Sequence, residues 1–244
     1  MDFRTPPWLA FLVGAAIFLI ARQAGTLPEL LGGEALSESM PWLNHAVIKT
    51  FLIVISLIGS LIWTRGALGQ HGYRRPKDMK WWPTIWPGFL LGALGTTMIF
   101  VTPAGGMDMA RMGTGLAIFL SVLYSSISEE VFIRGFIQSL MSHLRHRKVN
   151  LFIASVSVPA LTSGVLFGCM HLSVYFGGSD ALTTVIIMSY ATLLGIVAGY
   201  LFEKHKSIVP AIIVHIAANA GGFAAGVVMT IARFLLTGEL PQLP

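Results

Sequence analysis

The sequence predicts an all-α fold, a polytopic transmembrane helical bundle of about seven or eight spans. Hydrophobic residues occupy 55% of the 244 positions, and charged residues occupy only 11%. Soluble domains usually carry about 25% charged residues. The mean hydropathy of +0.74 also indicates an integral membrane protein. At about 20 residues per span, the length fits a single integral membrane domain over residues 1–244 and leaves no room for a second, soluble domain.

Apolar runs mark the individual helices. We expect the fourth run to continue as a helix to about residue 143, and the seventh to form either one long helix or two shorter ones. The first run has no small-residue cleavage site after it, so a retained span is expected in place of a signal peptide. The runs cover residues 8–21, 42–63, 84–102, 112–128, 151–174, 182–202 and 208–236.

Pairs of glycines four residues apart lie within these runs. Small residues at this spacing let two membrane helices approach closely, so we interpret the pairs as packing surfaces. They are Gly88/Gly92, Gly164/Gly168, Gly195/Gly199 and Gly222/Gly226.

Basic residues gather in alternate loops. Residues 65–80 hold five of them, and further basic residues follow the fourth and sixth runs. Lys and Arg favour the cytoplasmic side, so we expect a cytoplasmic N-terminus. The pI of about 9.6 then reflects this bias. No basic face with nucleic-acid readers is visible, so no nucleic-acid partner is expected.

Three clusters of polar side chains interrupt the apolar runs. A charge at the centre of a membrane helix costs about 2.5–3.5 kcal/mol, so residues of this kind mark a functional site by default. The clusters are Glu129, Glu130 and Arg134; Phe167 and His171; and His215 and Asn219.

In the first cluster, Glu130 and Arg134 are four residues apart and can form an ion pair on one helix face. Glu129 points about 100° away, so this spacing leaves it as the free carboxylate that can face a cavity. Burial and the nearby Glu130 charge would raise its pKa and bring it closer to the range that is useful for a general base. We therefore expect Glu129 to be the base. The alternative is a buried ionic clamp between helices that has no chemical role.

The other two clusters repeat the four-residue spacing. His171 can hold or polarise a water beside Phe167, or it can simply bond a backbone carbonyl near a helix end. His215 and Asn219 can both donate to a developing oxyanion, or they can serve as polar ties between helices. Taken together, the clusters supply the groups that activate water against a carbonyl, and they indicate amide hydrolysis.

Other hydrolase mechanisms lack their residues. The four aspartates lie in loops or at the terminus, and neither an HExxH helix nor a G-x-S-x-G element is present. Cys169 is the only cysteine, so neither an internal disulfide nor a cysteine-based zinc site can form. Cys169 and His171 lie on different sides of a helix and cannot pair within it.

The order EExxxR, FxxxH and HxxxN on successive apolar runs resembles the CAAX protease and bacteriocin-processing family, also called the Abi family, which includes the Ras-converting CAAX endopeptidase. The motif-bearing core spans about residues 112–222, and no motif position departs from the family pattern. Glu129, Glu130 and Arg134 match the first motif, Phe167 and His171 the second, and His215 and Asn219 the third.

The resemblance implies an intramembrane glutamic endopeptidase that uses no metal or other cofactor, with its catalytic cavity inside the bundle. Glu129 and His171 would activate water, and His215 and Asn219 would form the oxyanion hole. The substrate would be a membrane-associated peptide or protein, with prenylated CAAX-type C-termini as one branch of the family. The short loops suggest a prokaryotic cytoplasmic membrane. Glu130, Arg134 and Phe167 would support the site.

Two further functions stay open. Glu129, His171 and His215 could ligate zinc in a membrane metalloprotease. A non-catalytic regulator or bacteriocin immunity protein could use the same cluster to bind a partner helix. Simple alternation of spans also puts His171 too far from Glu129. A fifth helix that starts near Pro159, with residues 151–158 at the interface, would bring His171 inward.

Overall fold

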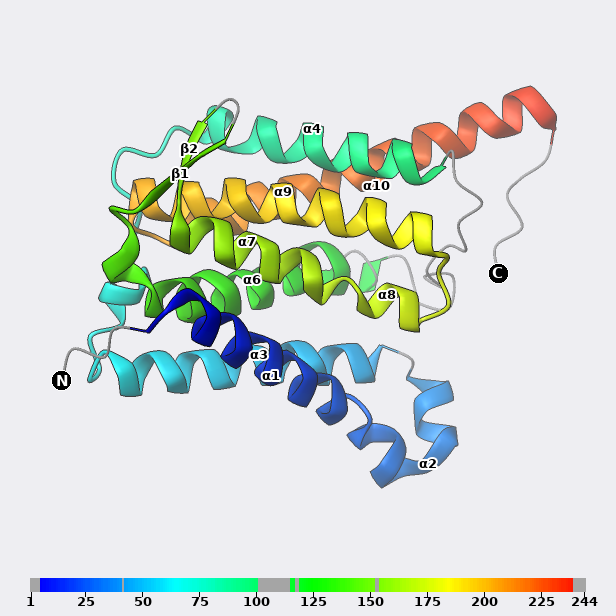
Figure 1. The fold of residues 1–244 in the computed structure, drawn as a ribbon. Helices are drawn as coiled ribbons and strands as arrows, with labels where there is room; N and C mark the ends of the chain where they lie inside the picture. The colour runs from blue at the N-terminus through cyan, green and yellow to red at the C-terminus, as the bar shows by residue number, and fades with distance from the viewer. Residues whose placement is uncertain (1–4, 41, 101–114, 117–118, 152–153, 239–244) are drawn as a thin grey trace.

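Long helices run side by side through the whole protein (Figure 1). The computed structural model describes residues 5–40, 42–100, 115–116, 119–151 and 154–238. The principal helices are α1 (Pro7–Ala24), α2 (Leu27–Ser39), α3 (Leu43–Trp63), α4 (Trp81–Phe100), α6 (Ser125–Glu130), α7 (Val158–Met170), α8 (Ser173–Phe176), α9 (Ala181–His205) and α10 (Val209–Thr237). Shorter elements are the 3-10 turns η1 (Leu68–His71) and η5 (Ser142–Leu144), the π-helical segments η3 (Phe119–Tyr124) and η4 (Val131–Gln138), and the strands β1 (Lys148–Leu151) and β2 (Ala154–Ser157).

The all-α polytopic fold is confirmed. Within the described residues, five helical stretches are long and apolar enough to cross a membrane, beginning at Pro7, Leu43, Val158, Ala181 and Val209. α4, which begins with two tryptophans and contains Pro87, is not in this set. The start of the fourth apolar run lies partly outside the described residues. The seventh run forms one continuous helix, α10.

The fifth apolar run is divided between a hairpin and a helix. Its first residues pair in the antiparallel β1–β2 hairpin, with Val149 opposite Val156, which the sequence reading did not predict. α7 then begins at Val158, with Pro159 in its first turn and the Ser157 side chain accepting from the Ala160 amide at 3.2 Å. The shortened helix with Pro159 at its start is thus confirmed, and it brings His171 to the C-terminal end of α7.

Glycine contacts hold the helices together at close range. A methyl group built on Gly164 would lie 2.8 Å from the Ile196 backbone nitrogen of α9, and one on Gly222 would lie 2.8 Å from Thr96 Oγ1 of α4. Gly88 and Gly92 of α4 likewise face the backbone of α10. The packing role is confirmed for seven of the eight predicted glycines. The exception is Gly226, where the nearest atom to an added methyl is 3.8 Å away.

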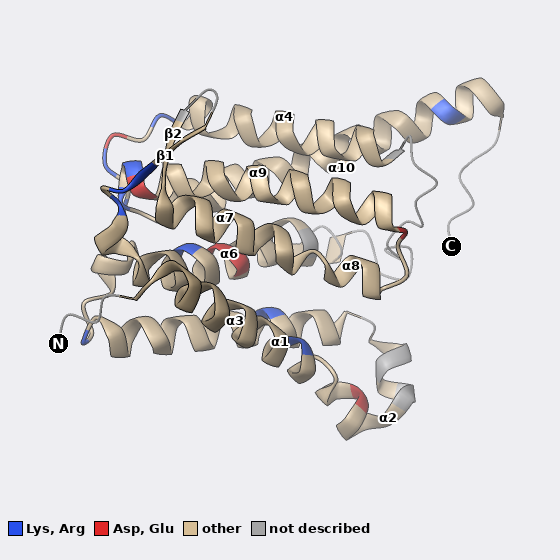
Figure 2. Ribbon diagram, viewed as in Figure 1, with Lys and Arg blue, Asp and Glu red and all other residues tan. Residues whose placement is uncertain are grey.

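Charged residues separate along the bundle axis (Figure 2). Lys and Arg gather at the end that carries the hairpin and the C-terminus of α9, whereas Asp180 and Glu29 lie toward the opposite end. Arg74 donates to the Lys206 carbonyl at 2.7 Å, which joins two of the basic loops. The alternate loops predicted to share one membrane side therefore do lie together.

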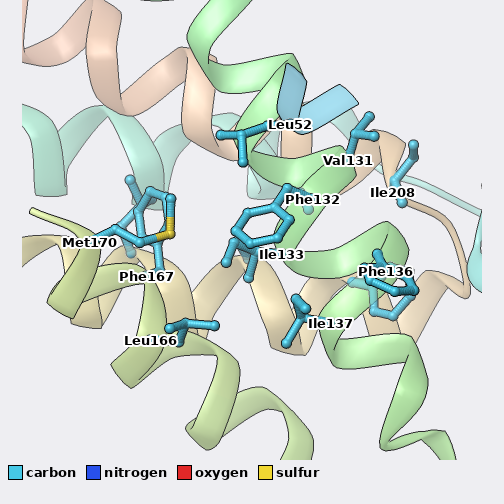
Figure 3. Packing of buried hydrophobic residues seen from close by; sticks show 14 of the residues in the cluster. Leu52, Val131, Phe132, Ile133, Phe136, Ile137, Leu166, Phe167, Met170 and Ile208 are labelled. Carbon is cyan, nitrogen blue, oxygen red and sulfur yellow. The ribbon is translucent and has the colours of Figure 1, made fainter. Parts of the chain in front are cut away.

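The core surrounds the helix that carries the first motif. Phe132, Ile133 and Ile137 of η4 are fully buried, and Leu166 and Phe167 of α7 pack toward them (Figure 3). Leu52 of α3 joins the same cluster from another side. A helix with apolar neighbours on several sides cannot turn its polar residues to lipid, so these must find partners within the bundle.

Candidate active site

The first motif lies on the longest unbroken buried stretch among the described residues. Every residue from Ser128 to Met141 is buried. The two glutamates occupy the last positions of α6, directly before the π-helical turns of η4. Short π-helical stretches are frequent at functional sites because the wider turn redirects the side chains around it.

Glu130 divides its two oxygens between two helices. Arg134 Nε donates to Glu130 Oε2 at 2.9 Å, which confirms the ion pair predicted from the four-residue spacing. His215 Nδ1 lies 2.9 Å from Glu130 Oε1, so α10 is tied to the same carboxylate. Both Glu130 and Arg134 are 0% exposed. Each oxygen of the Glu130 carboxylate thus has a partner, whereas Arg134 Nη2 is buried without a hydrogen-bond partner.

Arg134 extends this network to α7 and α9. Its Nη1 donates to Ser163 Oγ at 2.7 Å and to Gln138 Oε1 at 3.2 Å. Gln138 Nε2 in turn donates to the Gly199 carbonyl and to Glu203 Oε1, both at 3.1 Å. The sequence reading missed Ser163 and Gln138. A spacing signal was available, because Gln138 follows Arg134 by four residues on the same helix.

Glu129 has a partner that the sequence reading missed. Its Oε1 forms an ion pair with Lys49 Nζ of α3, so the prediction of a free carboxylate is wrong. Its Oε2 lies 3.7 Å from His215 Nε2. Charge interactions also connect Glu129 with His171. One carboxylate oxygen thus faces a cation, and the other faces a histidine ring.

The signal for Lys49 was present in the second apolar run. Lys49 is a lone cation among apolar residues there, and His45 precedes it by four residues. The cost of a buried charge that drew attention to Glu129 applies equally to this lysine. Figure 2 shows the cation on α3 and the acidic residues of α6 near mid-bundle.

Phe167 lies between the two histidines. Its ring centroid is 5.1 Å from that of His171 and 5.3 Å from that of His215, in edge-to-face geometry with both. The predicted packing of Phe167 beside His171 is confirmed. His171 Nδ1 lies 2.9 Å from the Phe167 carbonyl. A bond from His171 to a backbone carbonyl near a helix end was the alternative role predicted for this residue. Because a carbonyl only accepts, Nδ1 carries the proton, and a neutral ring then keeps its lone pair on Nε2.

His215 and Asn219 both contact the helix that carries the glutamates. His215 bonds Glu130, while Asn219 Nδ2 donates to Ser126 Oγ at 2.9 Å. These contacts are the polar ties between helices that we considered as the alternative role. They also place the His215 ring and the Asn219 amide on the same side of α10. The His215 ring in addition lies close to Glu129.

The titratable groups of the site do not group as metal ligands. Among the described residues, no three His, Cys, Asp or Glu side chains form a set that could hold a metal ion. The cation that faces Glu129 is a lysine of the chain itself. The geometry thus gives no support to the zinc alternative.

Comparisons with known proteins agree with the three motifs. Residues 112–221 match the family model described as type II CAAX prenyl endopeptidase Rce1-like. No curated protein and no solved structure matches the chain. The matched region contains both glutamates, Arg134, both histidines and Asn219, which carry the geometry described above. Through this region, which covers 110 of the 244 residues, the chain is similar to the Rce1-like CAAX prenyl endopeptidases, and the five long apolar helices among the described residues indicate an integral membrane protein.

Proposed function

We propose that this protein is a glutamic endopeptidase in which Glu129 and His171 activate the attacking water. The observation that carries the proposal is the convergence of three helices on one carboxylate. Glu129 Oε2 lies 3.7 Å from His215 Nε2 and interacts electrostatically with His171, while Phe167 holds the two rings in edge contact. A water bonded to Oε2 and to His171 Nε2 has a proton acceptor on each side.

These positions support a general-base hydrolysis of the peptide bond. The water oxygen attacks the peptide carbonyl as one water proton passes to Glu129, and the carbonyl oxygen takes up the negative charge. His215, when its ring carries both protons, donates from Nε2 to that oxygen, and the Asn219 side of α10 forms the rest of the oxyanion site. Collapse of the intermediate breaks the C–N bond, and the proton on Glu129 passes to the leaving amine.

The substrate that fits is a membrane-associated peptide or protein. The family acts on such substrates, and the site lies at mid-depth of an apolar bundle. A prenylated CAAX-type C-terminus is one candidate, because a lipid chain would hold the scissile bond at the bilayer. We place the basic end of the bundle, with the N-terminus, in the cytoplasm of a prokaryotic cell. Labelling of Arg147→Cys from outside intact cells by an impermeant maleimide, in a Cys169→Ser background, would overturn that orientation.

The deciding experiment uses purified protein in detergent with paired peptide libraries, one prenylated and one not. Wild type is expected to cleave, and Glu129→Gln and His171→Ala are each expected to lose at least about 10²-fold in kcat/KM. Glu29→Gln and His146→Ala change exposed residues of the same types and serve as matched controls. Cleavage that persists in Glu129→Gln would overturn the proposal.

Two further arms address the alternatives. Incubation with a strong zinc chelator is expected to leave cleavage unchanged, whereas a loss that zinc restores would favour the metalloprotease. Full biological activity in Glu129→Ala cells, with partner binding intact, would favour the non-catalytic regulator. Cleavage confined to the prenylated library would identify the lipid as part of the recognised substrate.

A further inference from the structure

A lysine outside the family-matched region reaches the carboxylate at the centre of the site. Lys49 lies on α3, and the family match begins at residue 112. The lysine is only 8% exposed, and its ammonium group pairs with Glu129 Oε1. A buried ammonium and a buried carboxylate each cost several kcal/mol to desolvate, so neither is retained as an ion without the other.

Neighbouring contacts fix α3 at this register. His45, one turn before Lys49, lies with Nε2 2.8 Å from Ser125 Oγ of α6. Thr50 Oγ1 lies 2.6 Å from the hydroxyl of Tyr124, just before α6. α3 is therefore held to the motif helix on both sides of the lysine, and the ion pair forms between two fixed backbones.

We propose that Lys49 is a positioning residue of this site, one that keeps Glu129 ionised and directs its second oxygen toward the histidines. With Oε1 bound to the ammonium group, Oε2 is the oxygen 3.7 Å from His215 Nε2. The inference rests on the proposed function, because Glu129 must act as the base. According to this proposal, the charge state of Glu129 depends on α3, a helix that carries none of the three motifs.

The other groups around Glu129 do not replace the lysine. Four other titratable side chains on the surrounding helices interact with the charge of Glu129. They are His45 of α3, His171 at the end of α7, Tyr190 of α9 and His215 of α10. Glu130, its neighbour in sequence, is engaged by Arg134 and His215. Lys49 is the amine in this set, and its charge does not depend on a ring that titrates near neutral pH.

The first test follows the protonation of Glu129 without any substrate. Dicyclohexylcarbodiimide adds to a protonated buried carboxyl group and rearranges to a stable N-acylurea, which mass spectrometry locates. In Lys49→Met, the pH at which labelling of Glu129 reaches half its maximum is expected to rise by about one to three pH units. Lys49→Arg keeps the positive charge and is expected to label as wild type does. Equal midpoints in wild type and Lys49→Met would overturn the proposal.

The second test follows catalysis. The acidic limb of the kcat/KM–pH profile is expected to move upward in Lys49→Met by the same interval as the labelling midpoint, and to return in Lys49→Arg. Ser56→Ala is the matched control, since Ser56 is a buried polar residue of α3 whose hydroxyl bonds the Leu52 carbonyl of the same helix. A uniform loss of activity across pH in Lys49→Met would indicate a purely structural lysine and overturn the proposal.

A reciprocal measurement covers the case in which Lys49 variants do not fold. In Glu129→Gln, the lysine loses its counter-ion, and its neutral fraction grows, so acetylation of Lys49 by acetic anhydride at pH 7 is expected to increase several-fold. Equal acetylation of Lys49 in Glu129→Gln and in wild type would overturn the proposed Lys49–Glu129 pairing. Because the labelling tests need no substrate, they can succeed while the peptidase assay fails, which separates an error about Lys49 from an error about the function.

Discussion

Two adjacent glutamates pair with different cations and share His215 as a neighbour. Glu130 is 0% exposed, and its two oxygens bond Arg134 and His215. Glu129 is 8% exposed and meets Lys49 with one oxygen while the other faces the histidines. The same side chain is thus fully buried in an ion pair at one position, whereas at the next position it keeps one oxygen directed toward histidine rings, as the proposed function requires.

A substitution at Glu130 is expected to lower stability. Glu130→Gln leaves Arg134 as a buried cation without its counter-ion, which costs about 3–5 kcal/mol. The unfolding midpoint in detergent is therefore expected to fall well below that of wild type. Glu129→Gln should fall less, since Lys49 retains some exposure. Equal midpoints for Glu130→Gln and the exposed-site control Glu29→Gln would contradict the assignment of Glu130 to structure.

Sequence spacing predicted contacts within a helix better than contacts between helices. The Glu130–Arg134 pair and the Phe167–His171 contact both follow from a separation of four residues. The Lys49–Glu129 pair joins residues 80 apart, and no local rule specifies which helix faces which. Ser163 was missed for the same reason, because it meets Arg134 from α7.

At the scale of elements, a buried turn braces the motif helix from the basic end. His71 of η1 is 4% exposed, and its Nδ1 lies 3.1 Å from Ser60 Oγ, which donates to the Gly135 carbonyl of η4 at 3.2 Å. Burial is the main cause that lowers the pKa of His71 to about 4. The Gly135 backbone acts in the opposite direction, and Arg145 adds to the lowering.

Because the pKa of His71 is lowered, we expect the contact of η1 with the motif helix to stabilise the fold less at acidic pH. As the pH falls from 7 to 4, the unfolded chain takes up a proton on His71 that the folded protein excludes, so folded-state stability falls. His71→Asn removes this titratable group. Between pH 7 and pH 5, the melting temperature of the variant should therefore fall by about 2–4 °C less than that of wild type. Thermal unfolding in detergent at both pH values measures the difference. Parallel losses in the two proteins would contradict it.

The positions of the long apolar helices followed from the sequence, whereas α2 and the hairpin did not. Pro159 and Ser157 together specify where α7 begins, because proline suits a first helical turn and the serine caps it. Residues 151–157 are interpreted as part of an apolar run, since a short strand and a short helical segment with such residues look alike in a hydropathy pattern. The hairpin depends on pairing across its turn, which hydropathy does not encode.

At the scale of the whole molecule, the bundle depends on backbones in near contact. Gly164 of α7 faces Gly195 and Ile196 of α9, and Gly88 and Gly92 of α4 face α10. Such contacts replace the hydrophobic driving force that is missing between helices in lipid. The glycine pairs predicted this packing, although sequence alone did not say which pair meets which helix.

An added methyl group should therefore have opposite effects at two glycines. Gly164→Ala places its Cβ 2.8 Å from a backbone nitrogen, so the unfolding free energy is expected to fall by about 1–3 kcal/mol. Gly226→Ala meets its first neighbour at 3.8 Å and should be neutral or stabilising, by up to about 1 kcal/mol, because alanine favours a helix. Denaturant unfolding in detergent compares the two. A larger loss at Gly226 than at Gly164 would contradict the packing.

The tie between Glu130 and His215 also affects how the protein is made. These residues are 85 positions apart, and α10 leaves the ribosome after every other helix described here. Until α10 enters the membrane, the carboxylates lack the imidazole that completes their surroundings. We expect a nascent chain to be inert, so that proteolytic activity first arises when insertion of the bundle is complete and neighbouring newly made membrane proteins are spared in the meantime.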